Sequence, residues 1–296
     1  MTLYIPGADE YVVCKEQFEL AERLLETSGS KEELSNLLQT FNDNLDAVRF
    51  LEAEFGERYG QVYGELSKRT RKSLEFKYVL MDKQHKYAQG VKALIESCES
   101  NNFHPKFTKS DGSTIYRSLT FNENSEARVN DYESYAVNKK LDLFNKWLDS
   151  CTGVAYKAGS NKFKIIPECS ELITIDPPFS NYYISVNYDN LDGKELDLMK
   201  GRYGQLLTKE EVLSHPAWNA AVEHDRYLLK AYTDIVFYEL KEKYDRKNGM
   251  SFWIRSQPEN DELRALFIDY LDDYSNANGN YDLNNRDSFF LLTKQK

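Results

Sequence analysis

The sequence has few of the residues that build disulfide frameworks or metal sites. Its cysteines are Cys14, Cys98, Cys151 and Cys169. They are far apart and form no C-x-x-C pair, which argues against both a disulfide framework and a zinc site in a chain of this length. Of the histidines, only His215 and His224 are near each other, and a metal site needs at least three converging ligands. We therefore expect buried free thiols, no bound metal and no cofactor.

Long apolar runs are also absent. The first residues, MTLYIPGADEYVVCKEQ, contain neither a basic segment nor an apolar run of the length that a signal peptide needs. No stretch approaches the 18 or so apolar residues of a transmembrane helix. We expect a soluble, cytoplasmic protein without a membrane partner.

The motifs of common enzyme classes are missing too. The sequence has no phosphate-binding P-loop and no G-x-S-x-G nucleophile elbow. Gly201 and Gly204 do not have the spacing of a dinucleotide-binding loop. These absences favour a binding protein over an enzyme.

What the chain does have is length, negative charge and aromatic side chains. Its 296 residues leave room for one large domain or two ordinary ones. With 38 Lys and Arg against 48 Asp and Glu, the net charge is −10, which disfavours direct nucleic-acid binding. Because the chain carries 21 Tyr and 16 Phe, we expect a core rich in aromatic rings.

The first part of the chain has helical periodicity. Phe18, Ala21, Leu24 and Leu25 form one stripe within residues 11–28. Ser30 and Glu33 have the spacing of a capping box that opens a second helix over 30–41. A third helix is expected after residue 42, with Leu45 and Val48 on its apolar face.

A longer apolar stripe follows. From Leu66 through Met81 to Cys98 the apolar residues recur mostly at steps of three and four, without a proline, which predicts either one long helix or two over 56–98. We expect it to project as an arm or to fold as a helical hairpin, and to offer a surface for homo-oligomers. The helical region is assigned to residues 1–102.

The character changes after residue 102. Asp111-Gly112 lies between two β-prone runs and predicts a hairpin. Strands are expected within 154–190, including 171–175, at 250–256 and at 286–293, and helices at 131–151, 217–244 and 261–274, with a capping box formed by Thr208 and Glu211. The predicted fold class is α+β, with a largely antiparallel sheet in residues 103–296.

One short motif suggests chemistry. Asp176-Pro177-Pro178-Phe179 resembles the D-P-P-[YF] motif of amino-group DNA methyltransferases. The resemblance implies that the carboxylate and a proline carbonyl accept hydrogen bonds from the target amine while the aromatic ring stacks on an extruded base. The glycine-rich turn with which that family binds S-adenosylmethionine is not found. A plain turn is the alternative interpretation, because proline presets turn geometry.

The C-terminal stretch 258–290 combines acids with tyrosines. It has eight carboxylates and two arginines, a local charge of −6. The candidate partner-binding residues are Tyr270, Asp272, Asp273, Tyr274 and Tyr281. Tyrosine supplies contact area at low entropic cost, and negative charge steers encounter with a basic surface. A merely solvated acidic surface is the alternative.

These patterns favour a non-enzymatic protein that binds another protein with a basic surface. The frequent Asn, Lys, Glu and Tyr are typical of a phage or mobile-element accessory protein, whose expected role is to inhibit a host defence or nucleic-acid-handling complex by contact. The alternative function is an S-adenosylmethionine-dependent amino-group nucleic-acid methyltransferase built on residues 176–179.

Overall fold

The structure is a computed structural model, and it divides the chain into two compact units, Met1–Glu75 and Phe76–Lys296. It describes residues 8–27, 29–43, 51, 53–70, 76–81, 84–98, 104–133, 141–179, 181–285 and 288–295. The fold is α+β, as the sequence predicts. The division differs from the expected one after residue 102, because the helix before that point belongs to the second unit.

The first unit is helical and has an aromatic core. Its described helices are α1 (Ala8–Glu26), α2 (Lys31–Asp43) and α4 (Glu57–Thr70). The capping box before α2 is confirmed, since the Ser30 main-chain N–H donates to Glu33 (2.9 Å) and the Glu33 N–H donates to the Ser30 hydroxyl (3.3 Å). The rings of Phe18, Phe41 and Tyr59 are buried together. Leu45 and Val48 lie outside the described residues.

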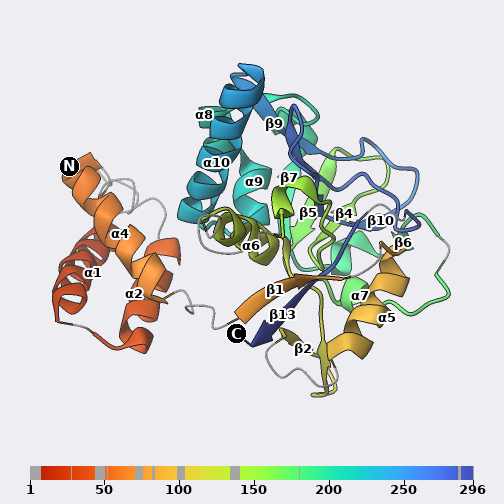
Figure 1. The fold of residues 1–296 in the computed structure, drawn as a ribbon, viewed down its shortest axis with the longest axis horizontal. Helices are drawn as coiled ribbons and strands as arrows, with labels where there is room; N and C mark the ends of the chain where they lie inside the picture. Colours follow the sequence, from red (N-terminus) through yellow and green to blue (C-terminus); the bar gives the residue numbers. More distant parts are fainter. Residues whose placement is uncertain are drawn as a thin grey trace, which may run out of the picture. The chain divides into compact units, whose positions relative to one another are not determined.

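Residues 56–98 do not form one long helix; they contain two helices, and the strand that separates them was not expected. After α4 the chain enters strand β1 (Phe76–Leu80) and then helix α5 (Tyr87–Cys98). Strand β1 pairs antiparallel with β13 (Leu291–Gln295), and Figure 1 shows the two strands side by side. This partner is more than 200 residues away in the sequence. The spacing of apolar residues within 56–98 therefore could not indicate the pairing.

The second unit is built around two larger sheets. The five-stranded sheet has the order β6-β10-β4-β5-β7 and the four-stranded sheet the order β11-β12-β9-β8. The strands are β4 (Gly153–Tyr156), β5 (Lys162–Ile166), β6 (Ile184–Ser185), β7 (Lys194–Asp197), β8 (Leu207–Thr208), β9 (Asn248–Trp253), β10 (Glu262–Ala265), β11 (Phe267–Ile268) and β12 (Ser275–Asn278). Among the pairings described, β12 with β9 is parallel and the others are antiparallel, so the mostly antiparallel sheet is confirmed. Short 3-10 helices lie at Leu143–Asn145, Tyr188–Asn190 and Leu198–Lys200.

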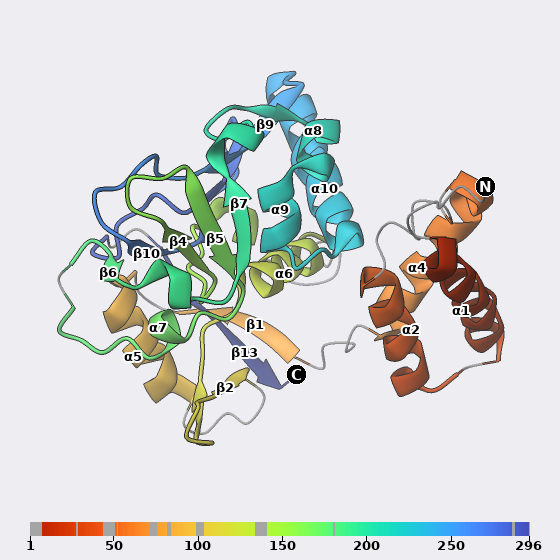
Figure 2. The ribbon, with the colours of Figure 1, turned by 180° about the vertical axis from the view of Figure 1, so that it is seen from behind.

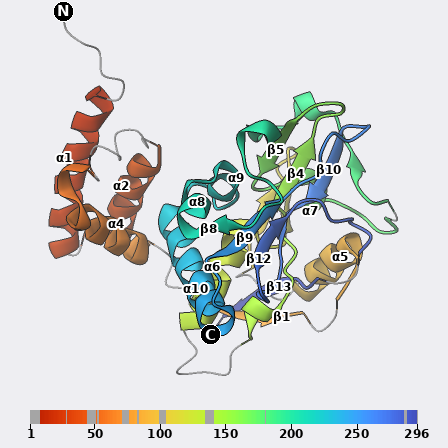
Figure 3. The same ribbon diagram turned by 90° about the horizontal axis from the view of Figure 1, so that it is seen from above.

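Helices cover both faces of the five-stranded sheet. Alternate residues of β4 belong to different cores: Val154 and Tyr156 pack with residues of α9 (Pro216–Ala221) and α10 (Arg226–Tyr244), and Ala155 packs with α5 and α7 (Ser170–Ile173). Figure 2 shows these helices around the sheet. Figure 3 shows β8, β9 and β12 near α8 (Lys209–Ser214) and α10.

Two signals of local structure are confirmed. The Asp111-Gly112 turn joins β2 (Lys106–Thr108) to β3 (Thr114–Tyr116), with Gly112 at φ +83°. The Thr208–Glu211 capping box opens α8.

The helix expected at 217–244 is interrupted. Helix α9 ends at Ala221 and α10 begins at Arg226, with Glu223 and His224 at positive φ between them.

Three expected elements are wrong. In the described part of 131–151, only residues 131–133 are α-helical, as the end of α6 (Phe121–Glu133), and Asp142, at φ 56°, precedes a short 3-10 helix; residues 134–140 lie outside the described residues. Residues 171–175 form no strand, because Ser170–Ile173 is helix α7. The helix expected at 261–274 is replaced by β10, β11 and a bend. Residues Glu262–Ala265 are buried along their whole length because they form a strand between β4 and β6, and the charges of Glu262 and Arg264 pair with each other there.

None of the described helices combines the length with the apolar character that crossing a lipid bilayer requires.

Candidate functional site

The bend between β11 and β12 presents four of the predicted partner-binding residues. Tyr270 and Tyr274 are 37% and 39% exposed, and Asp272 is also exposed. The ends of the bend are tied together, because the Asp269 main-chain N–H donates to the Asn276 carbonyl (2.9 Å) and the Asn276 side-chain amide donates to the Asp269 carboxylate (3.0 Å). The structure thus places these residues in a short connection whose ends are fixed by the pairing of β11 with β12.

Trp147 joins this bend to a second loop. Its indole stacks on Tyr270 with ring centroids 5.6 Å apart and planes 18° apart. It also meets Tyr281 edge to face at 5.5 Å, and Tyr281 meets Phe267 at 4.8 Å. The structure therefore brings all five predicted residues into one region. Sequence analysis missed Trp147 because it placed residues 131–151 in a helix.

Two further side chains that sequence analysis missed come from the end of α10 and the residues after it. The Tyr244 hydroxyl donates to the Asp272 carboxylate (3.3 Å), and the Arg246 guanidinium forms an ion pair with Asp273 (2.6 Å). Tyr244 is itself 43% exposed. We call Tyr244, Tyr270, Asp272, Asp273 and Tyr274 the tyrosine–aspartate surface. Arg246 balances part of its negative charge.

Buried Arg128 contacts the two segments on which the stacked rings of Trp147 and Tyr270 lie. Arg128 of α6 donates to the Tyr232 hydroxyl (2.7 Å) and to the main-chain carbonyls of Lys146 and Ile268. These carbonyls directly precede Trp147 and Asp269. One guanidinium thus holds both segments that carry the stacked rings. Burial raises the pKa of Asp269 to about 6, although the hydrogen bond from Asn276 opposes this shift.

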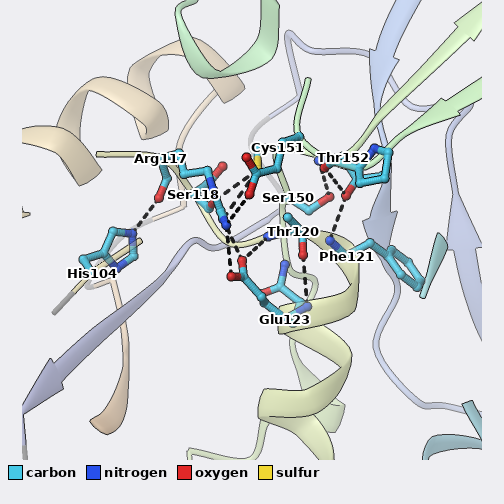
Figure 4. Close-up of polar contacts among 12 residues, drawn as sticks. His104, Arg117, Ser118, Thr120, Phe121, Glu123, Ser150, Cys151 and Thr152 are labelled. Carbon is cyan, nitrogen blue, oxygen red and sulfur yellow. Dashed lines mark hydrogen bonds and ion pairs between the residues drawn. The ribbon is translucent and has the colours of Figure 1, made fainter. Parts of the chain in front are cut away.

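A second polar cluster lies at the start of α6 (Figure 4). Thr120 and Glu123 form a capping box, with Thr120 N–H donating to Glu123 (2.8 Å) and Glu123 N–H donating to the Thr120 hydroxyl (3.1 Å). Buried Arg117 forms ion pairs at 2.7 Å with both Glu123 and Glu168. The Thr152 hydroxyl accepts from the Phe121 N–H (2.9 Å). These contacts fix the start of α6 against the segment before β4.

The cluster also contains a thiol and an imidazole, the groups that nucleophilic catalysis uses. Burial raises the pKa of Cys151 to about 12, so the thiol stays protonated, and it donates to the Ser118 carbonyl. Burial lowers the pKa of His104 to about 4. Its Nδ1 accepts from Thr293 N–H (3.2 Å), so its Nε2–H donates to the Arg117 carbonyl (2.7 Å). A protonated thiol and an imidazole bound to main chain on both sides suit a structural role.

Residues 176–179 are apart from both clusters in the fold. In methyltransferases the motif follows a strand, whereas here the preceding element is helix α7. Asp176 and Pro178 are exposed, and Phe179 packs partly against the core around α5 and Leu172. The segment therefore differs from the motif in the element before it and in the freedom of its aromatic ring.

The part of the chain that the structure describes contains no group of three or more His, Cys, Asp and Glu side chains arranged to bind a metal ion. Cys14, Cys98, Cys151 and Cys169 are all buried free thiols, as expected.

No protein-family model matches this chain, and neither does any curated protein. A solved structure from work on "Accommodation of massive sequence variation in Nanoarchaeota by the C-type lectin fold" is 15% identical, with a TM-score of 0.47. The alignment covers 76% of this chain and 99% of that chain. This similarity is too low to transfer any residue or role to the present chain.

Proposed function

We propose that this chain is a non-enzymatic protein that binds another protein through the tyrosine–aspartate surface. The observation that supports the proposal is the exposure of Tyr270 and Tyr274 on the bend, and of Tyr244 at the end of α10, beside two aspartates. Contacts with Trp147 and Arg128 position the bend. Rigid aromatic side chains lose little entropy when they become buried in an interface, and aspartates steer a basic partner into contact.

The experiment is site-specific photo-crosslinking in cells that encode the chain. A photoreactive phenylalanine analogue replaces Tyr274, and a matched chain carries it at Met199, which is 77% exposed on another segment. We expect one protein to crosslink at position 274 and not at position 199. The same adducts from both positions, or none from either, would contradict the proposal.

The cellular role is a further part of the proposal. We propose that the partner belongs to a host defence or nucleic-acid-handling complex, and that the chain acts in the cytoplasm as an accessory protein of a phage or mobile element. The composition supports this role, and the four free thiols suit a reducing compartment. The identity of the crosslinked protein and inhibition of its complex by the purified chain test it.

We also propose that the helical region mediates self-association. The adjacent side chains of Val12 and Val13 on α1 are 55% and 52% exposed. Sedimentation velocity of the full chain measures the assembly state. Val12→Ser with Val13→Ser should shift it towards the monomer, whereas an unchanged distribution would reject this surface.

A further inference from the structure

A small cavity lies beside the tyrosine–aspartate surface. It has a volume of about 20 Å³, which is enough for one group the size of a water molecule. Its lining includes four aromatic residues and two carboxylates, namely Tyr87, Trp147, Phe267 and Tyr281 with Asp149 and Asp282. Trp147 is shared, since the same indole that lines the cavity stacks on Tyr270. A group that enters this cavity therefore lies next to a partner bound at the surface.

The floor of the cavity contains a buried carboxylate. Asp149 is 6% exposed, and its main-chain N–H donates to the Phe289 carbonyl (2.9 Å) while its own carbonyl accepts from Asn124 (2.9 Å). Among the described residues, Ser288 is the one that donates a hydrogen bond to its carboxylate. Burial raises the pKa of Asp149 to about 7, against a lowering effect of Ser288. A buried carboxylate with so few partners gains strongly from a nearby cation.

The aromatic walls suit the same charge. Tyr281 meets both Trp147 and Phe267 edge to face, at interplanar angles of 84° and 80°. The face of an aromatic ring is negative and attracts a cation within about 6 Å of its centroid. The aromatic walls and the buried Asp149 carboxylate therefore favour a cation over an anion.

Arg264 fixes the residues at the rim of the cavity, and its own charge is already paired. Arg264 is buried and donates to the carbonyls of Asn280 and Tyr281 (3.3 and 3.2 Å) and to the Asp282 carboxylate (2.5 Å). Asp282 itself is 48% exposed, so the rim faces solvent. Arg264 also pairs with buried Glu262, which leaves its charge balanced. The rim is thus fixed in place and accessible.

We propose that the cavity receives the ε-ammonium of a lysine from the partner protein. This inference rests on the proposed function, since it specifies how the surface recognises a basic partner. The ammonium is compact and is carried on a thin flexible stem, whereas a planar guanidinium is larger than the space available. The lysine ammonium would lie between the Asp149 carboxylate and the rings of Trp147 and Tyr281.

The test uses the full chain and n-butylammonium as the probe, observed through the indole N–H signals of its three tryptophans in ¹H–¹⁵N spectra. Comparison with Trp147→Phe assigns the signal of Trp147. At pH 8 we expect n-butylammonium to shift that signal with saturation, and we expect n-butanol and n-butylguanidinium to leave it unchanged. Equal shifts by n-butanol, or no shift by the amine, would overturn the inference.

Two variants and one pH series complete the experiment. Asp149→Asn should weaken the amine affinity at least about tenfold, while Asp273→Asn, on the neighbouring surface, should leave it unchanged. If Asp149→Asn does not fold, Asp282→Asn at the rim tests the same charge and should also weaken binding. An affinity unaffected by the variant that folds would reject the site.

Amine binding to the wild type should strengthen as the pH rises from 6 to 8, because Asp149 loses its proton near 7 while the amine stays charged. Ser288 donates to Asp149, and the titratable groups that line the cavity with it are Tyr87 of α5 and Asp282, which is paired with Arg264; residues 286 and 287 lie outside the described part of the chain. A pH-independent affinity would reject Asp149 as the cation's partner.

The two proposals fail separately. Crosslinking at position 274 without amine binding would reject the lysine cavity and keep the proposed function. Amine binding without crosslinking would reject the proposed function and keep the cavity as an ammonium site only.

Discussion

The ring of Tyr270 lies parallel to the indole of Trp147 although the two residues are 123 positions apart, and the centroids are separated by 5.6 Å. Tyr270 is 37% exposed while Trp147 is half-buried. The stack therefore leaves part of the tyrosine ring for a partner and fixes its orientation beforehand. Preorganised aromatic residues of this kind often dominate the energy of an interface.

We predict that Tyr270→Ala weakens partner binding mainly by raising the dissociation rate, at a cost of about 2 kcal/mol or more. The reason is that the ring's contacts with the partner are short-range and form only once the two proteins are in place. Surface plasmon resonance with the crosslinked partner measures both rates. Tyr182→Ala, at a tyrosine that is 58% exposed elsewhere, is the control and should leave both rates unchanged.

Charge reversal at Asp272 and Asp273 should change the association rate of the partner. Asp272→Lys with Asp273→Lys is expected to lower the association rate, most strongly at low salt, because the Debye length falls from about 10 Å at 0.1 M to about 3 Å at 1 M. Stopped-flow association across a salt series measures this. Because Arg246 pairs with Asp273, we expect the reversal at Asp272 alone to have the larger share. A rate independent of salt in the wild type would contradict electrostatic steering.

Two methionines allow a matched test of the core. Met81 is 8% exposed and packs with α5, whereas Met199 is 77% exposed. Met81→Asp should destabilise the protein by several kcal/mol, roughly 3 or more, through a buried unpaired charge, and Met199→Asp should change stability by about 0.5 kcal/mol or less. Chemical denaturation measures both. Equal midpoints for the two variants would show that Met81 is not part of a core.

Acid should destabilise the protein through His215. This imidazole is buried against Tyr203 and Phe252, and burial lowers its pKa from 6.5 to about 4. The unfolded chain takes up a proton near pH 6.5 and the folded chain only near pH 4, so this stability is full above 6.5 and is lost as the pH falls towards 4. Asp149 has the opposite effect. Burial raises its pKa from 3.8 to about 7, so the folding stability that its protonated form contributes is lost as the pH rises towards 7.

The variant His215→Phe isolates the effect of His215. Relative to the wild type, its free energy of unfolding should increase on the order of 2 kcal/mol when the pH is lowered from 7.5 to 5. Urea denaturation at the two pH values gives the comparison. A difference between the two proteins that stays constant with pH would contradict the buried neutral imidazole.

The segment 176–179 provides a test between binding protein and methyltransferase. Since Asp176 is exposed and follows helix α7, we expect Asp176→Ala to change stability by about 1 kcal/mol or less, and we expect no binding of S-adenosylmethionine. Isothermal titration calorimetry on the wild type measures the second point. Micromolar binding would favour the methyltransferase alternative over the proposed function.

Sequence reasoning succeeded where the determining contacts are local. The pairs Ser30–Glu33 and Thr208–Glu211 each close a hydrogen-bonded ring within four residues, so the pattern contains the whole interaction. Thr120 and Glu123 have the same spacing, and this signal for the start of α6 was available in the sequence but not used.

Sequence reasoning failed where the partner is distant. Phe76–Leu80 is a strand because of residues 291–295, and Glu262–Ala265 is extended because β4 and β6 lie on its two sides. The candidate surface depends both on residues close together in the sequence and on contacts between distant segments. Its residues in the bend were identified from composition, whereas Trp147 and Tyr244 joined them only through contacts across the fold.

The pairing of β1 with β13 joins the first and last strands of the second unit. During synthesis, Phe76–Leu80 is made about 200 residues before its partner, so this strand has nothing to pair with until residues 291–295 have been made. Completion of the second unit therefore depends on a segment far along the chain. A chain that stopped before Leu291 would lack the strand that pairs with β1, even though every residue of the tyrosine–aspartate surface would already be present.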